Sequence, residues 1–198
     1  MSAPDPLQLL DLQLLDARRS VPSRQLGPPG PDESTLLRML QSAVRVPDHG
    51  KLVPFRFLRI AGDARQALGE ALVARTLERD PQAADAVIEK DRLRFSHAPV
   101  VIAVIARLTP GHKVPEQEQL LSAGSACFAL LQAAQALGFG AQWLTGWMAY
   151  DAAIATLLGV GENEKIIGFI HIGTPMLEVP ERERPDAAIL LSDWQPHA

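Results

Sequence analysis

The chain opens with apolar residues at helical spacing, which predict an amphipathic helix over residues 6–18. The apolar positions of this helix are Leu7, Leu10, Leu14 and Leu15. Proline and glycine cluster from residue 22 to residue 31, and this composition predicts a loop. The first helix therefore ends where Arg18, Arg19 and Ser20 stand.

A second amphipathic helix is predicted ahead of Pro47. Asp32 or Ser34 can cap its first turn, because each side chain carries an oxygen that accepts from free backbone N–H groups. Its apolar face consists of Leu36, Leu37, Leu40 and Val44. The C-terminal end of this helix delivers Arg45 and His49 to the loop that follows.

Two segments in the middle of the chain have the pattern of strands. Residues 55–60 alternate apolar and basic side chains, as a half-buried strand does. Two helices are expected next, from about residue 62 to residue 96. Residues 98–106 are apolar on both faces, which is typical of a strand in the centre of a sheet.

The second half of the chain predicts one long helix and two further strands. The helix covers residues 115–137 and ends in a turn of Gly138, Phe139 and Gly140. A short strand runs through Trp143, and a helix follows near residues 151–158. A buried strand over residues 166–172 is closed by Gly173, Thr174 and Pro175. The polar tail from about residue 180 has no readable pattern.

Composition places the chain among proteins in which helices pack on a sheet. Of its 198 residues, 47% are hydrophobic and only 5% aromatic, so aliphatic side chains must form the core. The length predicts one domain over residues 1–198. No segment is long and charge-free enough to cross a bilayer, and the N-terminus lacks a leader pattern, so we expect a cytoplasmic protein with no membrane partner.

Charge and cysteine content exclude two classes of protein. The net charge of -4 gives no long-range positive field, which argues against a nucleic-acid partner. Cys127 is the single cysteine, so the chain has no internal disulfide and is expected in a reducing compartment. Because Cys127 lies in an apolar helical run, we interpret it as a core residue rather than a nucleophile.

The triplet Arg18, Arg19 and Ser20 is the first candidate site. Two guanidinium groups and a hydroxyl suit a phosphate-bearing ligand. An alternative stays open, because cations at a helix C-terminus interact favourably with the backbone dipole. The hydroxyl of Ser20 can likewise satisfy backbone groups where the chain turns.

His49 is the second candidate, because it lies in a loop just after a helix end. The alternative is a surface histidine held by its neighbour Asp48. No metal site is expected, since neither His49 nor His112 has a second ligand at helical or hairpin spacing. We interpret Glu116 and Glu118 as the solvated start of the long helix.

Gly138, Gly140 and Gly146 bracket Trp143 and Thr145. Glycines here let the backbone approach a ligand closely, or they only end a helix and form a turn. Trp143 taken alone is more typical of a core than of a cofactor contact. The glycine spacing is not the dinucleotide fingerprint, which needs a strand before it and a helix directly after it.

With these segments in order, the chain resembles the nitroreductase family of FMN-dependent oxidoreductases, in particular its short single-domain bacterial members. The resemblance covers about residues 10–175 and depends on the order and separation of five groups of residues. The groups are Arg18, Arg19, Ser20; Arg45, Val46, Pro47, Asp48, His49 with Pro54, Phe55; His112, Lys113, Val114, Pro115; Gly138, Phe139, Gly140 with Trp143, Leu144, Thr145, Gly146; and Lys165, Ile166, Ile167, Gly168, Phe169 with Gly173, Thr174, Pro175.

The resemblance implies an α+β fold in which helices flank a central, mainly antiparallel sheet. It also implies an intertwined homodimer with FMN at the subunit interface. In this family pattern the phosphate, ribityl and ring edge are held by Arg18, Arg19 and Ser20. Arg45 and His49 would reach the flavin from the other subunit. The isoalloxazine would be lined by Trp143, Leu144 and Thr145.

The resemblance also implies an electron donor and a reaction. A nicotinamide cofactor, NAD(P)H, is assigned to Ala133, Ala134, Gln135, Ala136, Leu137 and Gly138. Hydride would pass from NAD(P)H through flavin N5 to an electron-poor acceptor such as a nitroaromatic or a quinone. The flavin carries this chemistry, so no side chain is assigned a catalytic role.

The chain departs from many members of the family at four positions. Lys51, Val53, Phe55 and Leu144 replace a polar Asn or Ser, a Gln, a Trp and a frequent Arg, and Lys51 could place a cation near the pyrimidine edge. Arg24, in a longer proline-rich loop, matches only in part. Two rival interpretations are open. One is a flavin-binding protein with little or no turnover, and the other is a cofactor-free interaction protein whose leucine-rich helices serve dimerisation.

Overall fold

The computed structural model describes residues 12–196. Of the helix predicted over residues 6–18, Leu7 and Leu10 lie outside the described residues, and residues 12–16 are helical. The elements that follow are η1 (Ser23–Gln25), β1 (Leu26–Gly27), α2 (Glu33–Ala43), η2 (His49–Lys51), β2 (Phe55–Ala61), α3 (Asp63–Arg79), α4 (Asp85–Arg92), β3 (Val100–Arg107), α5 (Glu116–Ala136), β4 (Gly140–Leu144), η3 (Trp147–Ala149), α6 (Ala152–Leu157), β5 (Glu164–Pro175) and α7 (Ala187–Leu190).

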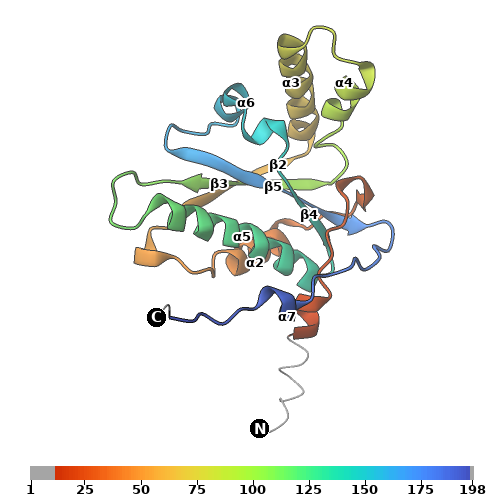
Figure 1. The fold of residues 1–198 in the computed structure, drawn as a ribbon. Helices are drawn as coiled ribbons and strands as arrows, with labels where there is room; N and C mark the ends of the chain where they lie inside the picture. Colours follow the sequence, from red (N-terminus) through yellow and green to blue (C-terminus); the bar gives the residue numbers. More distant parts are fainter. Residues whose placement is uncertain (1–11, 197–198) are drawn as a thin grey trace.

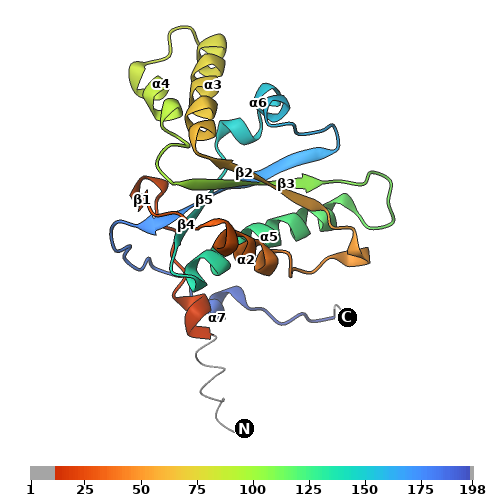
Figure 2. The ribbon, with the colours of Figure 1, turned by 180° about the vertical axis from the view of Figure 1, so that it is seen from behind.

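The strands form one antiparallel sheet in the order β1-β5-β3-β2, and β4 also pairs with β5. Figure 1 shows α3, α4 and α6 over one face of this sheet, with α2 and α5 over the other. The view from behind in Figure 2 has the same two layers of helices. The predicted α+β fold with a mainly antiparallel sheet flanked by helices is confirmed.

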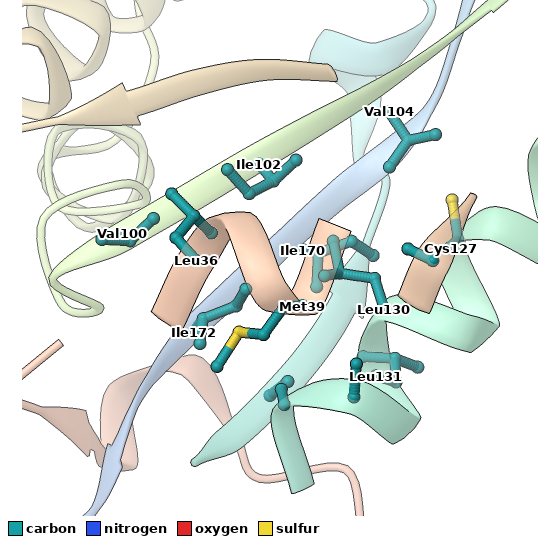
Figure 3. Packing of buried hydrophobic residues seen from close by; sticks show 14 residues of the cluster. Leu36, Met39, Val100, Ile102, Val104, Cys127, Leu130, Leu131, Ile170 and Ile172 are labelled. Atoms are coloured by element: carbon teal, nitrogen blue, oxygen red, sulfur yellow. The ribbon is translucent and has the colours of Figure 1, made fainter. Parts of the chain in front are cut away.

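The larger core lies between the sheet and the pair α2 and α5, where Met39 and Leu130 are fully buried. Figure 3 shows side chains of α2, α5 and the strands β3 and β5 meeting there. Cys127 belongs to this cluster, and burial raises the pKa of its thiol to about 12. Its interpretation as a core residue is therefore confirmed. A second cluster on the opposite face includes Phe95 and Phe169.

The predicted elements match the structure wherever the local pattern is strong. Asp32 is the N-cap of α2, since its Oδ1 accepts from the backbone N of Thr35 at 2.7 Å. The hydroxyl of Ser34 donates to the same carboxylate at 2.9 Å. Among the described helices, none combines the length and the apolar character needed to cross a membrane.

Two boundaries predicted from the sequence are wrong. Residues 22–31 are not only a loop, because η1 and β1 lie within them. The last strand does not close at Gly173, since β5 continues to Pro175. Leu26 and Gly27 pair with Pro175 and Thr174, and this long-range pairing makes a strand of β1 and extends β5 to Pro175.

Candidate functional site

Arginines surround a small pocket where the end of the first helix meets the C-terminal tail. The pocket has a volume of about 220 Å³, and Ser20 lies on its wall. Its lining includes four guanidinium side chains, from Arg18, Arg19, Arg182 and Arg184. Nη1 of Arg18 donates to the hydroxyl of Ser20 at 3.2 Å. The triplet predicted from the sequence is thus joined by two arginines from a distant part of the chain.

The charges around this pocket are unbalanced. Glu181 pairs with Arg19, and it also accepts from Arg184 at 2.9 Å. Burial, followed by the positive charges of Arg184, Arg182 and Arg19, lowers the pKa of Arg18 from its ordinary value. Cations held this close repel one another, so a bound anion would relieve the repulsion. The arrangement suits a phosphate group, which arginine binds through two parallel N–H donors.

Arg182 and Arg184 were missed in the sequence, because they lie in the tail that has no readable pattern. The basic and acidic residues that alternate after Pro180 were the only available signal. Their position depends on Glu181, whose carboxylate binds Arg19 more than 160 residues away along the chain. Such a contact cannot be derived from local spacing.

The segment after the triplet runs along β4. The backbone N of Val21 donates to the carbonyl of Ala141 at 3.1 Å, and the backbone N of Ser23 donates to Oε1 of Gln142 at 2.6 Å. The arginine pocket therefore lies beside the start of β4, and Trp143, Leu144 and Thr145 lie at its far end. The first group of predicted residues thus lies beside the start of the fourth, at Gly138 and Gly140.

Trp143 is at the surface of β4 and not in the core, with 36% of the residue exposed. Its Nε1 donates to the carbonyl of Ile167 at 3.2 Å, and its ring lies over Gly168, where a β-carbon would overlap it. Gly146 ends the segment in a left-handed turn with a φ of 70°. A side chain at Gly146 would meet Met148 and Arg94. Both glycines therefore permit a close approach of neighbouring groups.

Arg45 and His49 lie elsewhere, at the opposite end of α5. Nδ1 of His49 is 2.7 Å from Oε2 of Glu118, whereas the backbone N of Arg19 donates to the side chain of Gln135. Residues 118 and 135 are separated by about 25 Å along the helix, from the rise per residue. Within one chain, the second group is therefore not brought together with the first.

The alternative partner predicted for His49 is wrong. The carboxylate of Asp48 is occupied by its own loop, since it accepts from the backbone N of Leu52 at 3.0 Å and of Val53 at 2.8 Å. His49 pairs instead with Glu118, which is therefore more than a solvated helix start. Lys51 and Val53 have φ angles of 56° and 49°, a backbone conformation that is strained for a β-branched residue.

The other predicted positions lie at the C-terminal end of α5 and in β2. Ala133 and Ala134 are buried in the core, and Ala136 and Leu137 are exposed. The segment around Gln135 and Gly138 lines a second pocket of about 380 Å³, which Arg19 also lines. The ring of Phe55 is buried. Among residues 12–196, no group of three or more His, Cys, Asp or Glu side chains could hold a metal ion.

Comparison with known proteins gives consistent matches. The model of the family described as "Nitroreductase family" matches residues 15–174. The chain is 35% identical over 167 residues to "Putative NAD(P)H nitroreductase YdjA" of Escherichia coli strain K12, covering 84% of this chain and 89% of that protein.

Two solved structures share the fold. A nitroreductase-like family protein of Bacillus cereus is 18% identical with a TM-score of 0.79, and the match covers 99% of this chain and 100% of the other. A nitroreductase of Bacteroides fragilis, solved with bound FMN, is 21% identical with a TM-score of 0.68, and the match covers 93% of this chain and 98% of the other. At these identities the likeness shows the fold alone.

Proposed function

The chain belongs to the nitroreductase family, and from that premise we propose that it is an FMN-dependent oxidoreductase. In this proposal it passes hydride from NAD(P)H through flavin N5 to an electron-poor acceptor, such as a nitroaromatic or a quinone. The observation that carries the proposal is the arginine-lined pocket beside β4, because its donors suit the phosphate of a mononucleotide. The relative from Bacteroides fragilis binds FMN on the same fold.

Arg18 is proposed as the principal phosphate ligand. Its guanidinium has cations around it and, among residues 12–196, donates only to the hydroxyl of Ser20, whereas Arg19 is paired with Glu181. Arg182 and Arg184 extend the ligand set, and Ser20 adds a hydroxyl donor. Arg19 would shape this end of the site by its ion pair with Glu181 of the C-terminal tail.

The ring-binding part of the site is proposed along β4. Trp143, Leu144 and Thr145 follow Gly140, Ala141 and Gln142, which contact the segment beside the arginines. A ligand with its phosphate at the arginines can therefore extend along this strand toward Gly146. The free side of Trp143 offers a flat apolar surface to an aromatic ring.

Arg45 and His49 are proposed to contact the flavin of a second copy of the chain. The length of α5 between Gln135 and Glu118, about 25 Å, exceeds the reach of one mononucleotide. A symmetric homodimer lets two distant groups of one chain complete two equivalent sites. Exposed apolar side chains at Leu121 and Phe128 on α5 are consistent with burial against a partner.

The nicotinamide donor is proposed to bind near Ala133, Ala134, Gln135, Ala136, Leu137 and Gly138. The pocket of about 380 Å³ that Gln135 and Gly138 share with Arg19 supports this position. When bound, the flavin supplies hydride acceptance and release at N5. The side chains orient it, and the arginines balance the negative charge of its phosphate.

An FMN titration tests the proposal. The purified protein should be yellow, or take up one FMN per chain, and NADPH under anaerobic conditions should bleach the flavin absorbance. Arg18→Ala should weaken FMN binding about tenfold or more, because hydrogen bonds between charged groups contribute about 1.5–3 kcal/mol. The matched control is Arg92→Ala, since Arg92 pairs with Glu70 and Glu89 away from the pocket.

Three outcomes would contradict parts of the proposal. A colourless protein that takes up no FMN would reject the flavin site and favour a cofactor-free interaction protein. Bound flavin that NADPH does not bleach would support a binding protein without turnover. Equal FMN affinity in Arg18→Ala and Arg92→Ala would remove the arginine pocket as the phosphate site.

A further inference from the structure

Asp91 is the most deeply buried carboxylate among the described residues, with 2% of the residue exposed. It lies in α4, and no motif in the sequence includes it. Oδ2 accepts from the hydroxyl of Thr76 at 2.8 Å, and Oδ1 accepts from Nη2 of Arg94 at 2.8 Å. Nε1 of Trp147 lies 3.3 Å from both carboxylate oxygens. Donors from α3, η3 and the end of α4 therefore meet at one buried charge.

Two of these donors flank the turn that ends β4. Trp147 directly follows Gly146, and a β-carbon on Gly146 would lie 3.4 Å from Nη1 of Arg94. The guanidinium of Arg79 packs over the Trp147 ring, 5.0 Å from its centroid. The turn after Thr145 is thus held by side chains whose common anchor is Asp91.

A buried charge is costly to keep in a protein unless its partners are well placed. Moving any one donor away from such a carboxylate leaves part of the buried charge unpaired. Because this is costly, the donors stay in one arrangement around the carboxylate. Here the donors that Asp91 holds are Trp147, which directly follows Gly146, and Arg94, whose guanidinium lies next to Gly146. We propose that Asp91 is a positioning residue: by holding Arg94 and Trp147, it fixes the turn after Thr145 and thereby the ring-lining end of β4.

This inference rests on the proposed function, because it gives the turn a role only if residues 143–145 line the flavin ring. It predicts that changes at Asp91 alter the environment of the bound ring, although Asp91 itself does not touch it. A purely structural anchor would affect stability and leave the ring environment unchanged.

Two variants and one control separate these roles. Asp91→Asn keeps the volume and removes the charge, and Trp147→Phe removes one donor while Asp91 keeps Thr76 and Arg94. The control is Asp151→Asn. Asp151 also pairs with an arginine, at 3.0 Å from Nε of Arg75, and its side chain is 8% exposed. Its carboxylate accepts hydrogen bonds from Arg75 and from the backbone N–H groups of Ala153 and Ile154 at the start of α6.

The measurements are the FMN dissociation constant, the visible circular dichroism of bound FMN, and the melting temperature of each apoprotein. Asp91→Asn should weaken FMN binding by up to about tenfold and change the dichroism, because Arg94 and Trp147 lose the charge that holds them beside the turn. Trp147→Phe should change the dichroism in the same direction with a smaller loss of affinity. Asp151→Asn should lower only the melting temperature.

Trp147→Phe decides the question if Asp91→Asn does not fold, because it keeps the anchor charge paired. If Trp147→Phe binds FMN with wild-type affinity and dichroism, and only its melting temperature falls as in the control, the inference is overturned. The proposed function stays intact in that case. A wild-type protein that takes up no FMN would reject both.

Discussion

Replacing Gly168 with alanine should move Trp143 off β5. The β-carbon of alanine would overlap Nε1 and Cδ1 of the Trp143 ring, and it would lie 3.1 Å from the carbonyl oxygen of Leu144. Gly168 lies within β5, between β3 and the end of β4, so the backbone has no room to withdraw. The indole ring is the group that must move.

Two contributions determine how much Gly168→Ala lowers the free energy of unfolding. Moving the ring breaks the bond from Nε1 to the carbonyl of Ile167, 3.2 Å long, and a typical hydrogen bond contributes about 1 kcal/mol. Adding a methyl group to a packed site costs about 1–3 kcal/mol. Because Trp143 is 36% exposed, its ring can swing toward solvent, which favours the lower end of that range. We expect Gly168→Ala to lower the free energy of unfolding by about 2 kcal/mol.

Urea unfolding and FMN titration measure the two consequences. If Trp143 lines the flavin ring, Gly168→Ala should weaken FMN binding as well as stability. The matched control is Gly161→Ala, because a β-carbon there meets only the Glu164 side chain at 3.7 Å or more, an ordinary contact.

A double-mutant cycle identifies the cause. In a Trp143→Ala background, Gly168→Ala should cost less than about 0.5 kcal/mol, because the overlapping ring is gone. An unchanged cost in that background, or Gly168→Ala as stable as Gly161→Ala in the wild-type background, would refute the assigned contact.

Three further predictions concern titration and reactivity. The hydrogen bond from Arg56 lowers the pKa of Glu164 to about 2, so the stability that the ionised Glu164 contributes is fully present above pH 4.5. As pH falls toward 2, the free energy of unfolding measured with urea should fall by about 3 kcal/mol more in wild type than in Glu164→Gln. The same pH dependence in both proteins would contradict this prediction. Burial lowers the pKa of His171 to about 4, so protonation of this residue favours the unfolded chain. Between pH 6.5 and pH 4, the free energy of unfolding should fall by about 3 kcal/mol more in wild type than in His171→Phe. An equal dependence of the free energy of unfolding on pH in the two proteins would exclude this effect. Cys127 should react with a thiol reagent at pH 8 only after denaturation, and rapid labelling of the native protein would show that the thiol is accessible.

The sequence predicts the elements whose stability is local. Asp32 as the cap of α2, the apolar run of β3 and the long α5 all have patterns that physical rules recognise. The strand β1 has no such pattern, because its two residues depend on pairing with Thr174 and Pro175.

The site was predictable only in part. The triplet ending at Ser20 stands out by composition, but Arg182 reaches it through a tail contact that no spacing reveals. The predicted partner of His49, Asp48, is wrong because the Asp48 carboxylate accepts from backbone N–H groups of its own loop. His49 pairs with Glu118 instead. In the sequence, Asp91 looks like a surface acid in a polar helix. Its burial was not predictable, because its hydrogen-bond donors come from three separate segments of the chain.

The central claim is that each flavin site combines the arginines of one subunit with Arg45 and His49 of the other. Mixed dimers of Arg18→Ala chains and Arg45→Ala/His49→Ala chains test it most directly, by FMN titration after the two proteins are unfolded together and refolded. If each site spans two subunits, random mixing restores wild-type affinity to about a quarter of all sites, because each mixed dimer has one intact site. If each site lies within a single chain, no mixed dimer contains an intact site and no tight binding returns.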